Sequence, residues 1–175
     1  MKKLLLLSLV LLLSSCEKSN LEYRHDFEKS YALWLQFKAS CNDSYVYQVN
    51  NYSWVGVSWE TTITIENGIP VRRSFKMNLP VNYPYEVPAE VREWVEEASD
   101  LNTHEDSSAA YPFTVDEIYE KARTEWLIKR DNARICFEAL NNGLISSCGY
   151  VKDGCYDDCF TGIRIGFIWK IQTLL

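Results

Sequence analysis

Residues 59–77 constrain the fold of this chain more than any other segment. Large or β-branched residues alternate with polar ones over the first half of the segment, as in a strand with one buried face. Trp59, Thr61, Ile63 and Ile65 alternate with Glu60, Thr62, Thr64 and Glu66. Asn67-Gly68 then supplies the two residues with positive φ that a type I′ hairpin turn requires. Ile69 to Met77 is the predicted partner strand, and Pro70 near its start favours an edge position or an early bulge.

Helices and further strands are predicted on both sides of this hairpin. The first predicted helix has Phe27, Tyr31, Trp34 and Leu35 on one face and ends near residues 40–43. A short helix follows Pro88, with Val91, Trp94, Val95 and Ala98 as its apolar positions. A longer helix runs from Thr114 to Asn132. Four strands are predicted in addition to the hairpin. They are residues 44–50, with Tyr45, Tyr47 and Val49 on one side, residues 134–140, residues 144–150, and a last apolar strand at 162–172 that carries Ile163, Ile165, Phe167 and Trp169.

The order of these elements indicates the fold class. Thr114-Val115-Asp116-Glu117 is a capping box and marks the start of the longer helix. Helices interrupt the strands rather than alternating with them. We therefore predict an α+β fold, in which a mostly antiparallel sheet packs with an N-terminal helix, a short middle helix and one longer helix.

The first sixteen residues have the layout of a secretion signal. Lys2 and Lys3 precede ten nearly all-apolar residues, and small residues then lead to Cys16. Ten residues rise only about 15 Å as a helix, about half of the hydrocarbon core of a membrane, so a spanning helix is not expected. An ordinary cleaved signal with an incidental cysteine is an alternative interpretation.

Leu13-Ser14-Ser15-Cys16 resembles the lipobox of bacterial lipoproteins. The resemblance implies that residues 1–15 are removed, that Cys16 is acylated, and that several acyl chains hold the protein on a membrane. Residues 16–23 would then form a lipidated tether and residues 24–175 a single domain. We therefore expect a lipid-anchored protein of the bacterial cell envelope, on the periplasmic side or at the cell surface.

The chain is acidic, and its net charge of −6 would become −8 once Lys2 and Lys3 are removed with the signal. An acidic chain without a basic cluster argues against nucleic acid as a partner. Many of the acids lie in the middle of the sequence, at Glu90, Glu93, Glu96, Glu97, Asp100, Glu105 and Asp106. A solvated helix face followed by a mobile surface loop over residues 99–109 would explain this segment. A docking surface for a basic partner is the alternative.

Five cysteines besides Cys16 would lie in a compartment that permits disulfides. They are Cys41, Cys136, Cys148, Cys155 and Cys159. Two bridges and one free thiol are the simplest count. Zinc is the rival interpretation for the clustered cysteines, but the chain has no Cys-x-x-Cys pair and no histidine near the cluster. We therefore predict disulfides, no metal site and no cofactor.

The turn between the predicted strands 134–140 and 144–150 decides one possible bridge. A three-residue loop, Asn141-Asn142-Gly143, would place Cys136 opposite Cys148, where a cross-strand disulfide can form. A two-residue turn, Asn142-Gly143, would instead place Phe137 opposite Cys148. Cys155 and Cys159 can bridge each other or pair with another cysteine. The sequence leaves these alternatives open.

Residues 60–68, the Thr114-to-Trp126 helix, and residues 141–150 with 155–160 together carry a family resemblance. They resemble the uncharacterised secreted and lipoprotein family known as domain of unknown function 6174. The shared features are a hairpin closed by Asn-Gly, a helix that opens Thr-x-Asp-Glu, and a final sheet segment, within residues 31–168. The paired Cys-x-Cys of some members is absent, because only Cys41 stands at that point. The resemblance implies a fold and no catalytic residues.

Four aromatic residues, Tyr52, Trp54, Tyr83 and Tyr85, lie in predicted loops. Aromatic side chains on loops stack on sugars or bury in a protein partner, although they also cover the edge of their own core. No familiar catalytic motif is present, so an enzyme is not favoured. We interpret the chain as a binding domain for a protein, a glycan or another envelope component. An inhibitor or scavenger lipoprotein is one alternative, and a hydrolase whose site the sequence does not reveal is another.

Overall fold

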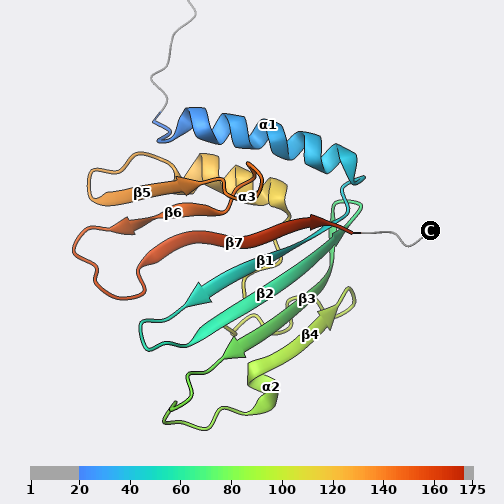
Figure 1. Cartoon of the computed structure of the whole chain (residues 1–175), viewed down its shortest axis with the longest axis vertical. Helices are drawn as coiled ribbons and strands as arrows, with labels where there is room; N and C mark the ends of the chain where they lie inside the picture. Colours follow the sequence, from blue (N-terminus) through green and yellow to red (C-terminus); the bar gives the residue numbers. More distant parts are fainter. Residues whose placement is uncertain (1–19, 172–175) are drawn as a thin grey trace, which may run out of the picture.

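The computed structural model describes residues 20–171, and these contain seven strands and three helices (Figure 1). The strands are β1 Tyr45–Tyr52, β2 Ser58–Glu66, β3 Ile69–Asn78, β4 Glu93–Glu97, β5 Ala133–Glu138, β6 Ser147–Lys152 and β7 Phe160–Lys170. The helices are α1 Arg24–Ser40, α2 Ala89–Arg92 and α3 Val115–Lys121, the last continuing as the π-helical turn η1 Ala122–Trp126. All strand pairs are antiparallel, in the order β4-β3-β2-β1-β7-β6-β5. The fold class is therefore α+β.

No helix within residues 20–171 is both long and apolar enough to cross a membrane. The lipobox and its cysteine lie outside the described residues.

The β2–β3 hairpin forms as its sequence predicts. Asn67 and Gly68 have φ of 50° and 77° and connect Glu66 directly to Ile69, which is the geometry of a type I′ turn. Thr64 pairs with Arg72 and Ile65 with Pro70, so one residue of β3 is extra at this point. The early bulge that Pro70 suggested is thereby confirmed.

The helices α1 and α3 pack on one face of the sheet through aromatic side chains. The ring of Trp34 on α1 lies 5.0 Å from that of Tyr45 on β1, in an edge-to-face arrangement. Phe27 makes a similar contact with Phe137 of β5 at 6.1 Å. Tyr119 on α3 lies 5.8 Å from the Phe27 ring and joins the two helices. Such pairs stabilise a core beyond the area that they bury.

Polar atoms of this aromatic core are satisfied by specific partners. The Tyr119 hydroxyl lies 2.7 Å from the Ser30 hydroxyl and accepts a hydrogen bond from the Ile145 amide at 3.2 Å. Burial raises the pKa of Tyr119 to about 12, so this phenol stays neutral. Asp116, in the capping box of α3, accepts hydrogen bonds from the Trp34 indole at 3.0 Å and the Lys38 ammonium at 2.6 Å. The first turn of α3 and α1 are therefore held together.

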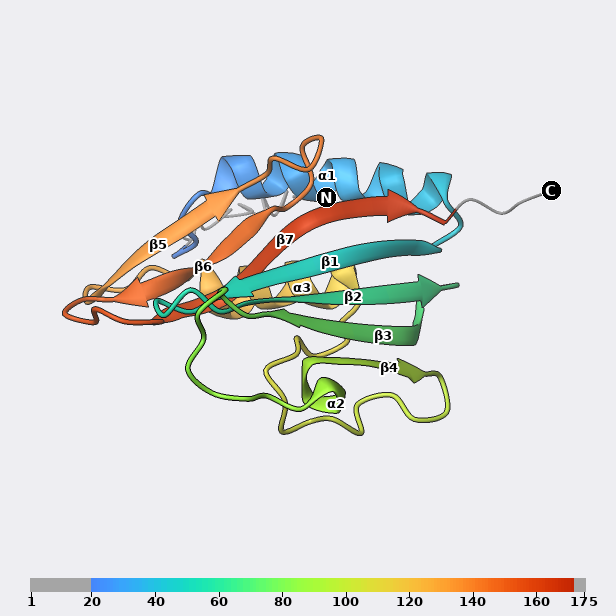
Figure 2. The same ribbon diagram turned by 60° about the horizontal axis from the view of Figure 1, so that its bottom comes forward.

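Strand β7 changes its neighbour part-way along its length. Residues 160–164 pair with β6, whereas residues 165–170 pair with β1. The register with β1 shifts between Gln48, opposite Phe167, and Val49, opposite Ile165, which leaves Gly166 as an extra residue. A Cβ at Gly166 would lie 2.4 Å from the side-chain amide nitrogen of Asn50, so a larger residue there requires the Asn50 side chain to move. Figure 2 shows β7 bent, with β5 and β6 inclined relative to β1 and β2.

The bulge at Gly166 reverses which residues of β7 face the core. Ile163 and Ile165 are buried before it and Ile168 after it. Phe167 and Trp169, which an unbroken alternation would place on the face of Ile163 and Ile165, therefore lie on the other face, and Trp169 is 61% exposed. One extra residue exchanges the two faces of a strand from that point onward.

The middle and the longer helix differ from their predicted extents. Trp94 and Val95 lie on β4, because pairing with β3 overrides the helical spacing of the segment after Pro88. The longer helix ends at Trp126 rather than Asn132. There the guanidinium of Arg130 donates to the Glu125 carbonyl at 2.6 Å and satisfies a carbonyl at the helix end.

Two smaller sequence predictions are also corrected. Leu35 is half exposed, because the buried stripe of α1 runs through Phe27, Ser30 and Trp34. The last hairpin has strands over 133–138 and 147–152, so the loop between them is longer than predicted.

Substitutions at two loop glycines test the hairpin geometry. Both Gly68 and Gly154 have positive φ, but a Cβ at Gly68 would lie 2.6 Å from the Asp43 carboxylate, whereas one at Gly154 would have nothing within 4 Å. We expect Gly154→Ala to lower the free energy of unfolding by about 1 kcal/mol, from backbone strain alone, and Gly68→Ala by about 2 kcal/mol or more. Urea denaturation measures both values, and equal losses would contradict the close contact at Gly68.

Candidate binding cleft

Three loops meet at one end of the sheet. They are the β1–β2 loop (53–57) and the β6–β7 loop (153–159), on the left in Figure 1, and the β3–α2 loop (79–88), at the bottom. The pairing explains this, since Ser58 at the start of β2 lies opposite both Tyr52 and Asn78. Strand β7 begins at the same end, because it runs antiparallel to β1. We call this surface the loop end.

The loop end carries the aromatic residues that the sequence singled out. Tyr52, Trp54 and Tyr85 are 60%, 74% and 72% exposed. Tyr83 is half-buried, and its ring lies edge-on to that of Tyr85 at 5.9 Å. The structure adds Tyr156 of the β6–β7 loop, which is 93% exposed. Sequence reasoning treated this residue only as part of a cysteine-rich loop.

The β6–β7 loop is fastened to the β1–β2 loop. Asp158 accepts hydrogen bonds from the Ser53 hydroxyl at 3.1 Å and from the backbone amide of Trp54 at 3.3 Å. A disulfide between Cys155 and Cys159 closes the same loop. The aromatic side chains are thus presented on loops that are tied to each other and to the sheet.

A cleft of about 610 Å³ opens at the loop end, where β1 and the first half of β7 are not paired. Its walls are formed on one side by Asn51, Tyr52 and Trp59, and on the other by Arg134, Val151, Phe160, Arg164 and the disulfide loop with Tyr156 and Asp158. Ser108 completes the lining. Of the four aromatic residues predicted to bind, only Tyr52 lines this cleft, and Trp54, Tyr83 and Tyr85 lie outside its walls.

Arg164 lies close to two aromatic rings. Its guanidinium carbon lies 3.8 Å from the centre of the Phe160 ring and 4.9 Å from that of Tyr52. The Phe160 ring in turn covers Gly149 of β6, where a Cβ would lie 2.6 Å from the ring. The glycine therefore makes room for the ring, and the ring supports the guanidinium. This stack bridges the opening between β1 and β7.

The cleft has more positive than negative charge. Neither Arg134 nor Arg164 has a carboxylate partner among the ion pairs of residues 20–171. The carboxylate of Asp158 already accepts the two hydrogen bonds from the β1–β2 loop. The indole N–H of Trp59 is buried and has no acceptor in the described part of the protein. The walls therefore offer unpaired donors beside flat aromatic faces.

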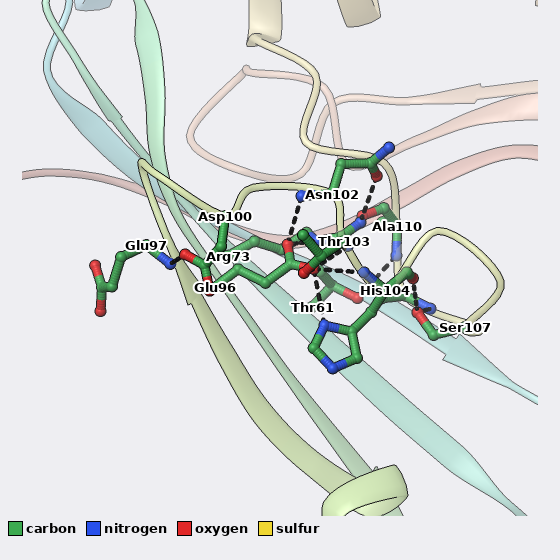
Figure 3. Close-up of polar contacts among 11 residues, drawn as sticks. Thr61, Arg73, Glu96, Glu97, Asp100, Asn102, Thr103, His104, Ser107 and Ala110 are labelled. Carbon is green, nitrogen blue, oxygen red and sulfur yellow. Dashed lines mark hydrogen bonds and ion pairs between the residues drawn. The ribbon is translucent and has the colours of Figure 1, made fainter.

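A second polar cluster lies at the opposite edge of the sheet, around Glu96 (Figure 3). Glu96 and Arg73 are both fully buried and form two hydrogen bonds of 2.8 Å each. The backbone amides of Asn102 and His104 each donate to Glu96 at 2.8 Å. Arg73 also donates to the Ala110 carbonyl at 3.3 Å. This pair therefore fixes the 98–110 loop over the edge of the sheet.

The interpretation of the acidic segment as a solvated face is wrong for Glu96. Burial alone would raise its pKa, but the hydrogen bonds from Arg73, His104 and Asn102 hold the pKa of this carboxyl well below 4.5. The loop over residues 99–109, predicted to be mobile, is anchored on this carboxylate. Nothing in the cluster is aimed at an open site, so we assign it a structural role.

The cysteines form fewer bridges than predicted. Cys155 and Cys159 are joined, whereas Cys41, Cys136 and Cys148 are free. Asn142 and Gly143, with φ of 54° and 88°, form a two-residue turn between Asn141 and Leu144. The register therefore places Phe137 opposite Cys148, as the second turn alternative required.

The register also explains why Cys136 and Cys148 do not bond. Cys136 lies opposite Gly149, and the neighbouring Phe137 is the residue opposite Cys148. The two thiols consequently lie on different faces of the hairpin. Burial raises the pKa of both thiols, which disfavours the reactive thiolate. No group of three His, Cys, Asp or Glu side chains in the range 20–171 is arranged to hold a metal ion.

Comparisons of this chain with protein-family models, with curated proteins and with solved structures found no match. The candidate site is therefore argued from the geometry of the loop end alone.

Thiol counting tests the single disulfide. In a Cys16→Ser variant, unfolded without reductant, we expect Ellman's reagent to titrate three thiols, from the three free cysteines. Prior reduction should raise the count to five, because Cys155 and Cys159 are then also free. A count of one without reductant would mean that a second bridge forms, and a count of five would mean that none does.

The Glu96 cluster makes a prediction about stability and pH. Glu96→Gln leaves the buried Arg73 charge without its counter-ion, so the free energy of unfolding at pH 7 should fall by about 3 kcal/mol. The folded pKa of Glu96 is below the unfolded value of 4.5. Its stabilisation is therefore complete above about pH 5 and is lost as the pH falls below 4.5 toward the folded pKa.

Chemical denaturation from pH 7 to pH 3 should accordingly show the wild type and Glu96→Gln converging on acidification. The matched control is Glu97→Gln, since Glu97 pairs with Arg72 at the surface with 65% of its side chain exposed. This control should cost less than about 1 kcal/mol. A difference between wild type and Glu96→Gln that does not change with pH would contradict the lowered pKa.

Proposed function

We propose that this protein is a lipid-anchored lipoprotein of the bacterial cell envelope whose single domain binds an envelope component through the loop end. One observation carries the proposal, namely the gathering of exposed aromatic residues on three loops at one end of a rigid sheet. Tyr52, Trp54, Tyr85 and Tyr156 are all more than half exposed there. Large exposed aromatic side chains are costly in solution and are typical of binding surfaces.

The construction of the loops supports binding rather than internal packing. Side chains that cover their own core are buried, but Trp54 and Tyr156 are among the most exposed large residues of the described chain. Asp158 and the Cys155–Cys159 bridge restrain the loops that carry them. A restrained loop loses little conformational entropy when it binds, so its contacts contribute more fully to affinity. Functional residues are commonly presented in this way on loops of a rigid scaffold.

The start of the domain lies close to the loop end. The Asn20 carbonyl accepts a hydrogen bond from the Lys129 amide at 2.8 Å, and Leu21 bridges to Ile128. Ile128 and Lys129 lie a few residues before β5. Close to them in sequence, the Asn132 carbonyl accepts a hydrogen bond from the backbone amide of Asp153, at the start of the β6–β7 loop. The four residue steps from Cys16 to Asn20 span at most about 14 Å. An acylated Cys16 would therefore keep the loop end near the membrane, which favours a partner in the envelope.

The resemblance to the domain of unknown function 6174 names no activity, and the proposal does not depend on it. The lipobox supports the location, and the loop end supports the binding. The two halves of the proposal can therefore be tested separately.

Photo-crosslinking in living cells tests the binding half. We expect p-benzoylphenylalanine in place of Trp54 or Tyr85 to form adducts with the same envelope component on irradiation. The matched control is the same amino acid in place of Trp169, an exposed tryptophan at the far end of β7. The control position should give no such adduct. Adducts at all three positions alike, or none at Trp54 and Tyr85, would overturn the binding surface.

The same experiment in a Cys16→Ser background tests the anchor. The variant should leave the membrane fraction, and the adducts at positions 54 and 85 should decrease with it. A variant that stays in the membrane fraction would overturn the lipid anchor and leave the binding surface untouched.

A further inference from the structure

We propose that the cleft at the loop end binds a saccharide that carries a carboxylate group, such as a uronic acid or a muramic acid unit. This inference rests on the proposed binding function and names the ligand class for part of the same surface. The inference rests on two unpaired arginines and several aromatic rings in this cleft. They come together because β7 pairs first with β6 and then with β1.

The arginines specify the charge of the ligand. The Arg164 guanidinium lies over the Phe160 and Tyr52 rings, and its N–H donors lie in the guanidinium plane. None of these donors has an acceptor among the hydrogen bonds of the described residues, and the same holds for Arg134. A planar guanidinium matches the two oxygens of a carboxylate in a bidentate pair. Because the chain as a whole is acidic, two free arginines in one cleft are a local exception.

The aromatic residues and the neutral donors specify a sugar ring. A sugar presents an apolar C–H face, which packs on an aromatic ring, and hydroxyl groups at its edge. Tyr156, which is 93% exposed, supplies a ring for this contact, while Tyr52 and Phe160 support the arginine beside it. The side chains of Asn51 and Ser108 supply hydrogen-bonding groups. A volume of about 610 Å³ falls within the usual range for small-molecule sites and accommodates one or two sugar rings.

A peptide is the main alternative ligand, because β1 has unpaired backbone at Asn50–Tyr52 on the side of β7. An added strand would have to lie along that backbone. The contact between Tyr52 and Arg164 crosses the opening at this point and obstructs it. The side chains, and not the strand edge, therefore form the recognition surface, which favours the saccharide.

The full-length protein in a non-ionic detergent can be tested against a panel of disaccharides. The probes are uronic-acid and N-acetylmuramic-acid saccharides, their neutral counterparts in which the carboxylate is amidated, and an aspartate-rich peptide. We expect at least one carboxylated saccharide to bind at least about tenfold more tightly than its amidated form, with a change in the fluorescence of Trp59. Trp59→Phe should remove most of that change while the affinity measured by calorimetry falls by a smaller factor.

Two arginine variants locate the site. Arg164→Gln and Arg134→Gln should each weaken carboxylate binding about tenfold or more, and bring the affinity toward that of the amidated sugar. Arg134 is exposed near the start of the edge strand β5, so its replacement leaves the fold intact even if the Arg164 variant is destabilised. The matched control is Arg72→Gln, an exposed arginine on β3 that does not line the cleft, and it should not change binding.

The outcomes separate this inference from the function on which it rests. Failure to bind any carboxylated saccharide, equal affinity for the amidated forms, or preference for the peptide would each overturn the saccharide inference. If crosslinks from positions 54 and 85 persist in those cases, the loop end still binds a partner and only the ligand class is wrong. If those crosslinks are also absent, the proposed function itself fails.

Discussion

The change of partner along β7 is the constraint on which the rest of this structure depends. A single strand, β7, joins the four-stranded part of the sheet formed by β1 to β4 with the part formed by β5 and β6. The extra residue at Gly166 allows the two parts to incline, since a bulge bends its strand and increases the local twist. The same bulge leaves the end of β1 unpaired, and the candidate cleft lies in that opening.

Two separate groups of interactions stabilise the structure on the two sides of this strand. The aromatic core between the sheet and α1 and α3 contributes through burial, with its hydroxyl groups satisfied by partners such as Ser30 and the amide of Val115. At the β4 edge a buried ion pair, Arg73–Glu96, fixes the loop that covers the sheet. A buried pair contributes little net free energy compared with apolar residues, but the loss of one partner is expensive. We therefore interpret this pair as a determinant of loop position more than of total stability.

Local signals in the sequence predicted local structure well. The alternation before Asn67-Gly68 and the capping box at Thr114 depend on neighbouring residues, and both features are present in the structure. The alternative registers of the last hairpin could be enumerated, but the choice between them needed the turn itself. Burial of Glu96 could not be predicted from its segment, because its partner Arg73 lies 23 positions away. A signal was present in the register of β3, since Arg73 lies directly opposite the inward Ile63.

The candidate cleft was largely beyond sequence reasoning. Tyr52 was identified as a loop aromatic, but its relation to Phe160 and Arg164 depends on a pairing between distant segments. Glycines at positions 149, 162 and 166 were the available hint, because glycine inside a strand marks a bulge or a close approach. Gly149 makes room for Phe160 and Gly166 forms the bulge. The functional surface thus follows from where the sheet departs from regular pairing.

Nuclear Overhauser contacts between backbone protons of β1 and β7 test this account most directly. The structure predicts contacts that link Gln48 with Phe167 and Val49 with Ile165, together with contacts between Cys148 of β6 and Ile163. It predicts no backbone contact between Asn51 and Ile163, because the strands have separated there. Regular contacts between Asn51 and Ile163 would mean that the ladder continues to the end of β1, which would close the cleft and contradict the account.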